Sequence, residues 1–173
     1  MKRIELEAEL ERLHAAAFGW ALSCCAWDRE AAEDTLQSSY LKVLDGRARF
    51  GGRSSFKTWW FGVIRRTAAE ERRKTAWWRL LSLERFLGHP QLHDARRDPE
   101  AELIRSEASA RLVAALGRLS ARQRDLLHLV FYQELSIAEA ADVLELPVGT
   151  ARTHYERGKK RLRALLGGTD RGG

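Results

Sequence analysis

The chain has 173 residues, of which 45% are hydrophobic and 31% are charged, and its formal net charge is +6. This length fits one domain or two small ones, and the hydrophobic content excludes wholesale disorder. No apolar run has the length of a membrane span and no signal peptide is visible, so we expect a cytoplasmic protein. The only two cysteines, Cys24 and Cys25, are adjacent, which fits small buried side chains better than a disulfide framework or a metal site.

The positive charge is concentrated in two blocks. Residues 45–79 contain ten basic and three acidic residues, a net charge of +7, and residues 147–166 contain six basic residues and one acid, a net charge of +5. Residues 1–44, in contrast, contain five basic and eight acidic residues, a net charge of −3. Two separate cationic surfaces on a small protein indicate contact with nucleic acid at two places.

The spacing of apolar residues predicts helices, and no stretch alternates with the period of two that a half-buried strand requires. Residues 4–21 form the first predicted helix, with acids near its start, where the helix dipole favours them. Asp28 is a suitable N-cap for a second helix. The apolar positions expected in that helix are Leu36, Tyr40, Val43 and Leu44.

Residues 45–55 form a predicted loop, because glycines interrupt the helical pattern and Ser54 or Ser55 suits the N-cap of the next helix. Aromatic and cationic residues are interleaved in the segment that follows. Aromatic rings stack on unpaired bases while Lys and Arg follow the phosphates, so this block is typical of a single-strand binding site. The alternative is a core position for the tryptophans: we expect Trp60 to be buried, and the position of Trp59 stays open.

Residues 77–97 are predicted to be a flexible linker. His89 and His93 are four residues apart, but Pro90 argues against a regular helix there and no third ligand is nearby, so we expect no metal. A second domain begins at Asp98, where an N-cap is followed by a proline. Ser120 and Gln123 then form a capping box before another helix. Its expected apolar residues are Leu126, Leu127, Val130 and Phe131.

Residues 136–166 have the pattern of a helix-turn-helix motif, whose second helix enters the DNA major groove. Ser136 and Glu139 form a capping box, and Pro147 ends a short turn. Many such turns have a glycine at the position of Glu145, where a positive φ would cost a glutamate about 1 kcal/mol. The second helix has a cationic face and an apolar edge. The apolar edge consists of Val148, Ala151, Tyr155, Leu162, Leu165 and Leu166. A solvated charged helix is the alternative, but the caps, the turn and the phase of the apolar edge favour DNA binding.

We therefore predict an all-α protein with two small helical domains joined by a flexible linker. The first domain covers residues 1–76 and the linker covers residues 77–97. The second domain covers residues 98–167, and residues 168–173 form a disordered tail.

The order and spacing of these parts resemble the extracytoplasmic-function (ECF) subfamily of bacterial RNA polymerase sigma factors, in the sigma-70 family. The resemblance covers residues 10–75, which are similar to sigma region 2, and residues 100–166, which are similar to sigma region 4. It implies a subunit that directs promoter recognition and transcription initiation, with catalysis left to the polymerase. Its implied partners are the polymerase core, through the β′ clamp helices and the β flap, promoter DNA as duplex and single strand, and an anti-sigma factor. The implied location is cytoplasmic, at the nucleoid or held at the membrane by the anti-sigma factor.

The resemblance also implies three sets of site residues. The set for core polymerase is Asp34, Gln37 and Tyr40. The set for binding and melting the −10 element is Arg53, Ser54, Ser55, Phe56, Lys57, Thr58, Trp59, Arg65 and Arg66. The set for the −35 element is Arg152, Thr153, Glu156, Arg157 and Lys160. The chain differs from the family at Ser38, where an acid is common, and at Arg66, where Asn is common.

Two other functions account for parts of the sequence less completely. A stand-alone helix-turn-helix regulator that binds duplex DNA as a dimer accounts equally well for residues 120–166, but not for the aromatic and cationic block at 50–74. An enzyme is not indicated, because the sequence has no paired carboxylates, no nucleophile with a neighbouring base and no phosphate-binding glycine loop. No cofactor is expected.

Overall fold

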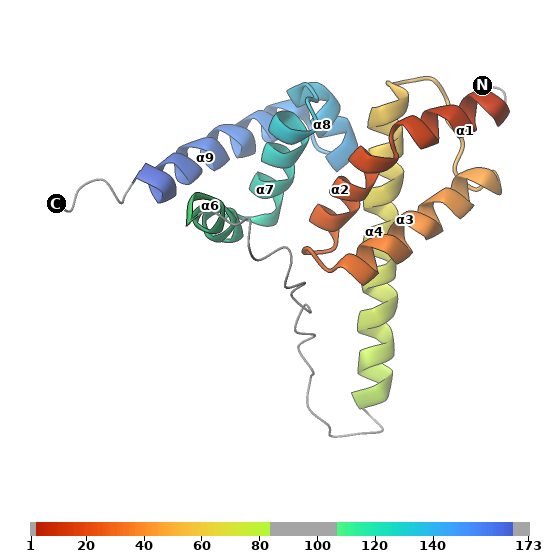
Figure 1. Ribbon diagram of the computed structural model, residues 1–173, viewed down its shortest axis with the longest axis horizontal. Helices are drawn as coiled ribbons and strands as arrows, with labels where there is room; N and C mark the ends of the chain where they lie inside the picture. Colours follow the sequence, from red (N-terminus) through yellow and green to blue (C-terminus); the bar gives the residue numbers. More distant parts are fainter. Residues whose placement is uncertain (1–2, 84–106, 168–173) are drawn as a thin grey trace. The chain divides into compact units, whose positions relative to one another are not determined.

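The structure is a computed structural model that describes residues 3–83 and 107–167. Over these two ranges the regular elements are all helices, with no strand, as the sequence predicts (Figure 1). The chain divides into two compact units, one built mainly from α1–α4 and the other mainly from α6–α9. The expected two-domain helical architecture is therefore confirmed. His89, His93, Asp98 and the tail lie outside the described residues.

The first unit contains α1 (Arg3–Arg12), α2 (His14–Cys24), α3 (Arg29–Leu44) and α4 (Phe56–Leu83). Helices α2, α3 and α4 pack against one another around fully buried aromatic side chains, including Trp20, Trp60 and Phe61. The indole nitrogen of Trp20 donates a hydrogen bond to the carbonyl of Phe61 at 3.0 Å, which joins α2 to α4. The expected burial of Trp60 is confirmed.

The single helix predicted for residues 4–21 is two helices, because the chain bends at Leu13 (φ −93°, ψ 1°). The Leu13 amide still donates to the Glu9 carbonyl at 3.1 Å, and its carbonyl accepts from the Ala17 amide at 2.8 Å. The break is therefore a bend within a nearly continuous helix. Asp28 caps α3 as predicted, since its carboxylate accepts from the Ala31 amide at 3.1 Å.

The structure changes two expectations at the ends of helices in this unit. Leu44 was expected to be an apolar packing position, but it is 46% exposed and lines a shallow groove beside Leu10 and Tyr40. Helix α4 continues to Leu83, so the predicted domain boundary at residue 76 falls inside a helix. The sequence explains the length, because the first helix-breaking residue after position 76 is Gly88.

The second unit contains α6 (Glu107–Gly117), α7 (Ala121–Leu127), the π-helical turn η1 (His128–Tyr132), α8 (Ile137–Leu144) and α9 (Val148–Gly167). Both predicted capping boxes are present. Ser120 and Gln123 cap α7 reciprocally. The Glu139 amide donates to the Ser136 hydroxyl at 3.2 Å, and the Ser136 amide donates to the Glu139 carboxylate at 2.9 Å. Local cap chemistry thus determines where these helices begin.

The π-helical turn corrects the expectation for Phe131, which was assigned to the buried side of its helix but is 63% exposed. The Gln133 amide donates to the His128 carbonyl, five residues back, at 3.0 Å. The wider turn changes the phase of the helix, so Leu129 stays buried while Phe131 and Tyr132 face solvent.

A glycine allows α9 to approach α7 closely. A Cβ atom on Gly158 would lie 3.3 Å from the Cβ of Gln123 and 3.4 Å from a methyl carbon of Leu127. Gly158 is buried between these helices, so the position of the basic helix depends on its missing side chain. No helix among the described residues is both long enough and apolar enough to span a bilayer.

Candidate nucleic-acid interfaces

The second unit contains the predicted helix-turn-helix, formed by α8, a three-residue turn and α9. In the turn, the Leu146 amide donates to the Ala141 carbonyl at 2.9 Å. Glu145 has a φ of +54°, so the position that is often glycine in such turns is left-handed in this chain. Since left-handed backbone costs a residue with a Cβ roughly 1–2 kcal/mol, the turn stores strain that a glycine would avoid.

Helix α9 has a buried side and an exposed side. Ala151, Tyr155 and Gly158 are buried against the rest of the unit. The five residues predicted to contact the −35 element are all exposed: Arg152, Thr153, Glu156, Arg157 and Lys160. At 3.6 residues per turn they lie within an arc of about 140°. Val148, which was expected on the apolar edge, is instead exposed, because it is the first residue of α9 and precedes the packed stretch.

Most of the positive charge on this face is directed to solvent. Within the described ranges, no ion pair is found for Arg152, Arg157 or Lys160. The Thr153 hydroxyl donates a hydrogen bond to the Gly149 carbonyl at 3.0 Å. Glu156, the one acid of the face, pairs with Lys159 at 2.9 Å. A regular helix with a row of solvated cations has the form of an element that enters a DNA groove.

The first unit carries the second predicted site, at the loop between α3 and α4. Gly46 and Gly52 have φ values of +73° and +69°, so the loop uses glycine where the chain turns. The Ser55 hydroxyl accepts from the Thr58 amide at 3.1 Å and lies 2.8 Å from the Thr58 hydroxyl. Ser55 therefore caps α4, as one of the two predicted candidates, and the buried Thr58 side chain stabilises the end of the loop.

Three aromatic rings form a cluster at this loop. The ring centroids of Phe50, Phe56 and Trp59 are 5.2–5.4 Å apart, and each side chain is partly exposed. Phe50 was not among the predicted site residues. The signal that could have found it is an aromatic residue placed between an arginine and two glycines in a loop. A half-exposed ring cluster offers flat surfaces on which unpaired bases stack.

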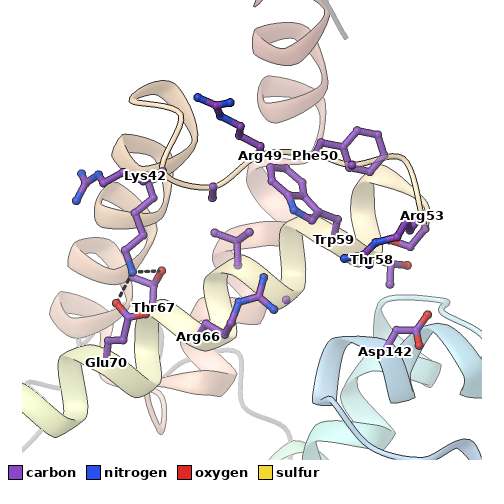
Figure 2. Close-up of a pocket in the computed structure, with 16 residues that line it drawn as sticks. Lys42, Arg49, Phe50, Arg53, Thr58, Trp59, Arg66, Thr67, Glu70 and Asp142 are labelled. Atoms are coloured by element: carbon purple, nitrogen blue, oxygen red, sulfur yellow. Dashed lines mark hydrogen bonds and ion pairs between the residues drawn. The ribbon is translucent and has the colours of Figure 1, made fainter.

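A basic hollow lies beside the cluster, between the end of α3, the loop and α4 (Figure 2). Its lining in this unit combines the rings of Phe50 and Trp59 with four arginines, Arg47, Arg49, Arg53 and Arg66. Ser54 and Thr58 also line it, whereas Ser55, Phe56, Lys57 and Arg65 from the predicted −10 set do not. The hollow therefore combines stacking surfaces with cations that attract a phosphate backbone.

Lys42 joins α3 to α4 at the edge of the hollow (Figure 2). Its ammonium group donates to the Thr67 hydroxyl at 3.1 Å and to the Glu70 carboxylate at 2.5 Å. The hydrogen bond from Lys42 lowers the pKa of Glu70, so this carboxylate stays ionised and the pair stays intact at neutral pH.

The residues predicted to bind polymerase lie on α3. Asp34 and Gln37 are exposed, whereas Tyr40 is partly buried, with its ring centroid 5.1 Å from that of Trp60. Its hydroxyl lies 2.9 Å from the Nδ1 atom of His14, and burial raises the pKa of Tyr40. Leu41, one turn after Gln37, is 50% exposed and was missed by the sequence analysis. An apolar side chain beside polar ones on an open helix face is typical of a protein contact.

The cysteine pair contributes to packing at the end of α2. The Cys25 sulfur lies 3.4 Å from the Thr35 hydroxyl, and burial raises the pKa of the Cys25 thiol. A raised pKa keeps the thiol protonated and weakly reactive. Both cysteines are only partly buried, where the sequence predicted small buried side chains. The described residues contain no group of three or more His, Cys, Asp or Glu side chains that could hold a metal ion.

Together these features define a class: a helical protein with a helix-turn-helix and an exposed cationic helix in one unit, and a basic loop with partly exposed aromatic rings in the other. Models of known families match both parts. Residues 9–78 match sigma-70 region 2, and residues 109–162 match sigma-70, region 4. The stand-alone regulator does not account for the match to region 2.

Individual relatives give the same assignment. The ECF RNA polymerase sigma factor SigX of Bacillus subtilis is 34% identical over 137 residues, which cover 79% of this chain and 71% of SigX. The RNA polymerase sigma factor YlaC of the same organism is 28% identical over 134 residues, covering 78% of this chain and 76% of YlaC. The chain belongs to the ECF subfamily of sigma-70 factors and is an alternative sigma factor.

Solved structures agree with the fold. The sigma factor RpoE of Bartonella quintana, in complex with the anti-sigma factor NepR, has a TM-score of 0.72 and 26% identity, over 96% of this chain and 99% of that one. CnrH, in complex with the cytosolic domain of CnrY, has a TM-score of 0.66 and 21% identity over 98% of this chain and 92% of that one. The second likeness concerns the fold alone.

Proposed function

We propose that this sigma factor reads its promoter with two separate surfaces, the exposed face of α9 for the −35 duplex and the basic hollow with its ring cluster for the opened −10 strand. The observation that carries the proposal is the difference between the two surfaces. One is a straight helix with solvated cations, and the other is a loop with half-exposed rings among arginines. Duplex DNA is read by the first kind of surface and unpaired bases by the second.

The proposed mechanism involves no bond chemistry in this chain. Arg152 and Arg157 reach base edges in the major groove, where an arginine bonds guanine through two nitrogens. Unstacking a base costs a few kcal/mol, which a shaped site recovers only for the bases it fits. Strand opening and sequence choice are thereby coupled, and core polymerase performs the synthesis.

The −35 assignment is tested by Arg157→Ala with Arg161→Ala as the matched control. Both arginines are exposed on α9, but Arg161 lies about 40° outside the proposed face. Holoenzyme containing Arg157→Ala is expected to bind promoter DNA roughly tenfold more weakly, from a contact worth about 1–3 kcal/mol, while its affinity for core polymerase is unchanged. Arg161→Ala should change promoter affinity much less. Equal loss of promoter and polymerase binding by Arg157→Ala would contradict the assignment.

The −10 assignment is tested by Lys57→Glu with Lys74→Glu as the control. Both lysines are on α4, but Lys74 is 17 positions further along and exposed. Lys57→Glu puts a negative charge in the first turn of α4, one residue after Phe56 of the ring cluster. It should reduce strand opening, seen as weaker permanganate reactivity of thymines near the −10 element, more than it reduces duplex binding. The same permanganate footprint in wild type and Lys57→Glu would refute this role.

For core polymerase, the proposal uses the exposed side of α3. Asp34 and Gln37, with Leu41 one turn later, form a mixed polar and apolar strip that suits the β′ clamp helices, while the β flap would contact the second unit. Gln37→Ala combined with Leu41→Ala should weaken copurification with core polymerase. Glu33→Ala, an exposed change on the same helix, should not.

We also propose control by an anti-sigma factor that covers these polymerase-binding surfaces. RpoE, which is 26% identical to this chain, is seen in complex with the anti-sigma factor NepR. The sigma factor would then be held inactive in the cytoplasm, or at the membrane if its anti-sigma factor is anchored there, and would act at the nucleoid when released. Competition between core polymerase and the anti-sigma factor for the purified chain tests this control.

A further inference from the structure

Glu156 is the single acidic residue of α9, a helix that otherwise carries six Lys and Arg side chains. It is exposed, and on the helical repeat it lies between Arg152, one turn earlier, and Lys160, one turn later. A carboxylate in this place is repelled by DNA phosphates and reduces the attraction that the surrounding cations provide. General attraction to DNA therefore does not explain its place at the centre of the face.

The carboxylate of Glu156 is held by a lysine that is itself anchored. Its Oε1 atom pairs with the Lys159 ammonium at 2.9 Å, and that ammonium lies 4.6 Å from the ring centroid of the buried Tyr155. The Lys159 side chain is only 23% exposed. The pair carries little net charge and restricts the glutamate side chain, while the Oε2 atom retains lone pairs for another donor.

The position of Glu156 fits contact with base edges. Residues one turn apart on a helix are separated by about 6 Å along its axis, which is roughly two base-pair steps of 3.4 Å. If Arg152 contacts one base pair, Glu156 contacts a base pair about two steps away. Glu156 is the ninth residue of α9, within the N-terminal half of the helix that contacts bases in such motifs.

We propose that Glu156 is a specificity-determining residue that selects cytosine at one position of the −35 element. A carboxylate accepts a hydrogen bond from the N4 amino group of cytosine in the major groove. Guanine presents the acceptors N7 and O6 there, and thymine presents O4, so either base would face the carboxylate with acceptor against acceptor. Adenine also presents an amino donor, N6, but it lies beside the acceptor N7, which opposes the second carboxylate oxygen. The acid thus contributes by rejecting wrong bases as much as by binding the right one. This inference depends on the proposed −35 role of α9.

The test is selection of promoter DNA by the holoenzyme, reconstituted from core polymerase and the full chain, from a library randomised through the −35 region. Wild type is expected to enrich cytosine about tenfold at one position, the effect of a contact worth 1–3 kcal/mol. Glu156→Ala should lose the preference at that position and keep the others. Glu156→Gln should move the preference toward adenine, because a glutamine amide bonds adenine N6 and N7.

Arg161→Gln is the matched control, since it also changes a charged, exposed residue of α9 but lies outside the proposed face. It should leave every base preference as in wild type. Binding of each variant to core polymerase, measured without DNA, checks that the chain is folded.

Each other result has a definite meaning. If both Glu156 variants keep the wild-type preference at every position, or lose all preferences together, the inference is wrong and the −35 role of α9 stands. If wild-type holoenzyme enriches no sequence in this region, the proposed −35 recognition itself fails, and the inference fails with it.

Discussion

Acidification is expected to destabilise the second unit through one histidine. His128 begins the π-helical turn, where its Nε2 atom lies 3.2 Å from the side-chain amide nitrogen of Gln133 and its ring packs on Tyr132. Burial lowers the pKa of His128 from 6.5 to about 4. The unfolded chain therefore binds a proton at a higher pH than the folded chain does. Stability is complete above pH 6.5 and falls as the pH decreases toward 4.

The magnitude follows from the two pKa values. The full difference between 6.5 and 4 corresponds to about 3 kcal/mol, at 1.36 kcal/mol for each tenfold change in proton affinity. Roughly 2 kcal/mol of this is lost between pH 7 and pH 5, which is about a 30-fold change in the unfolding equilibrium. That is a large part of the stability of a small helical unit.

Hydrogen exchange of the full chain can measure this loss of stability in the second unit specifically. Peptides from α7 and η1 should lose about 30-fold in protection factor between pH 7 and pH 5, after correction for the intrinsic exchange rate. All six tryptophans precede residue 79, so tryptophan fluorescence reports on the first unit and serves as an internal control. In His128→Gln the pH-dependent part of the loss should disappear. If wild type and His128→Gln lose protection equally, the reasoning is refuted.

Two further changes test backbone positions in the second unit. Gly158→Val should destabilise the unit by about 1–3 kcal/mol, because even a Cβ atom at this position would lie 3.3 Å from the Cβ of Gln123. Gly149→Ala is the control and should have little effect, because no atom lies within 4 Å of a Cβ at that position. Both are measured by hydrogen exchange of α7, and equal behaviour would contradict the packing argument. Glu134 has a φ of +57°, so Glu134→Gly should relieve about 1 kcal/mol of backbone strain and raise the thermal midpoint of the unit. A lower midpoint than in wild type would show that this strain is absent.

Helix starts were predictable because cap chemistry is local. Asp28, Ser120 and Ser136 each cap the helix assigned to them, with the hydrogen bonds that their spacing to the next turn implies. At Glu145 the sequence raised a positive φ only as a condition, from the glycine that is common at this position of the motif, and the structure shows that the condition is met. Such features depend on a few neighbouring residues, and the sequence contains all of them.

The phase of the π-helical turn could not be predicted, because the sequence shows no local signal, such as a proline or a cap, for the hydrogen bond from the Gln133 amide to the His128 carbonyl. The packed unit buries Leu129 and leaves Phe131 outside. Apolar spacing on its own gives the opposite assignment for Phe131.

The two candidate interfaces also differ in how far the sequence predicts them. On α9, the buried positions Ala151 and Tyr155 set the phase of the helix, so the exposed face follows from the sequence. In the loop, the position of Phe50 depends on two ring contacts, to Phe56 and Trp59, that helical periodicity does not describe. Leu41 was missed for a third reason, since an exposed leucine is common and becomes informative only beside a partner surface.

The size of the ring cluster sets a limit on what this chain does without polymerase. Stacking on an aromatic side chain returns about 1–3 kcal/mol for each base, and taking a base out of the duplex costs a few kcal/mol. The rings of Phe50, Phe56 and Trp59 have centroids no more than 5.4 Å apart and form one small surface. Stacking on this surface can offset the free energy of unstacking about one base. Opening several base pairs therefore requires further contacts from the polymerase. On the proposed function, the first unit would select a strand that the holoenzyme opens, and its arginines would retain that strand once the bases are unpaired.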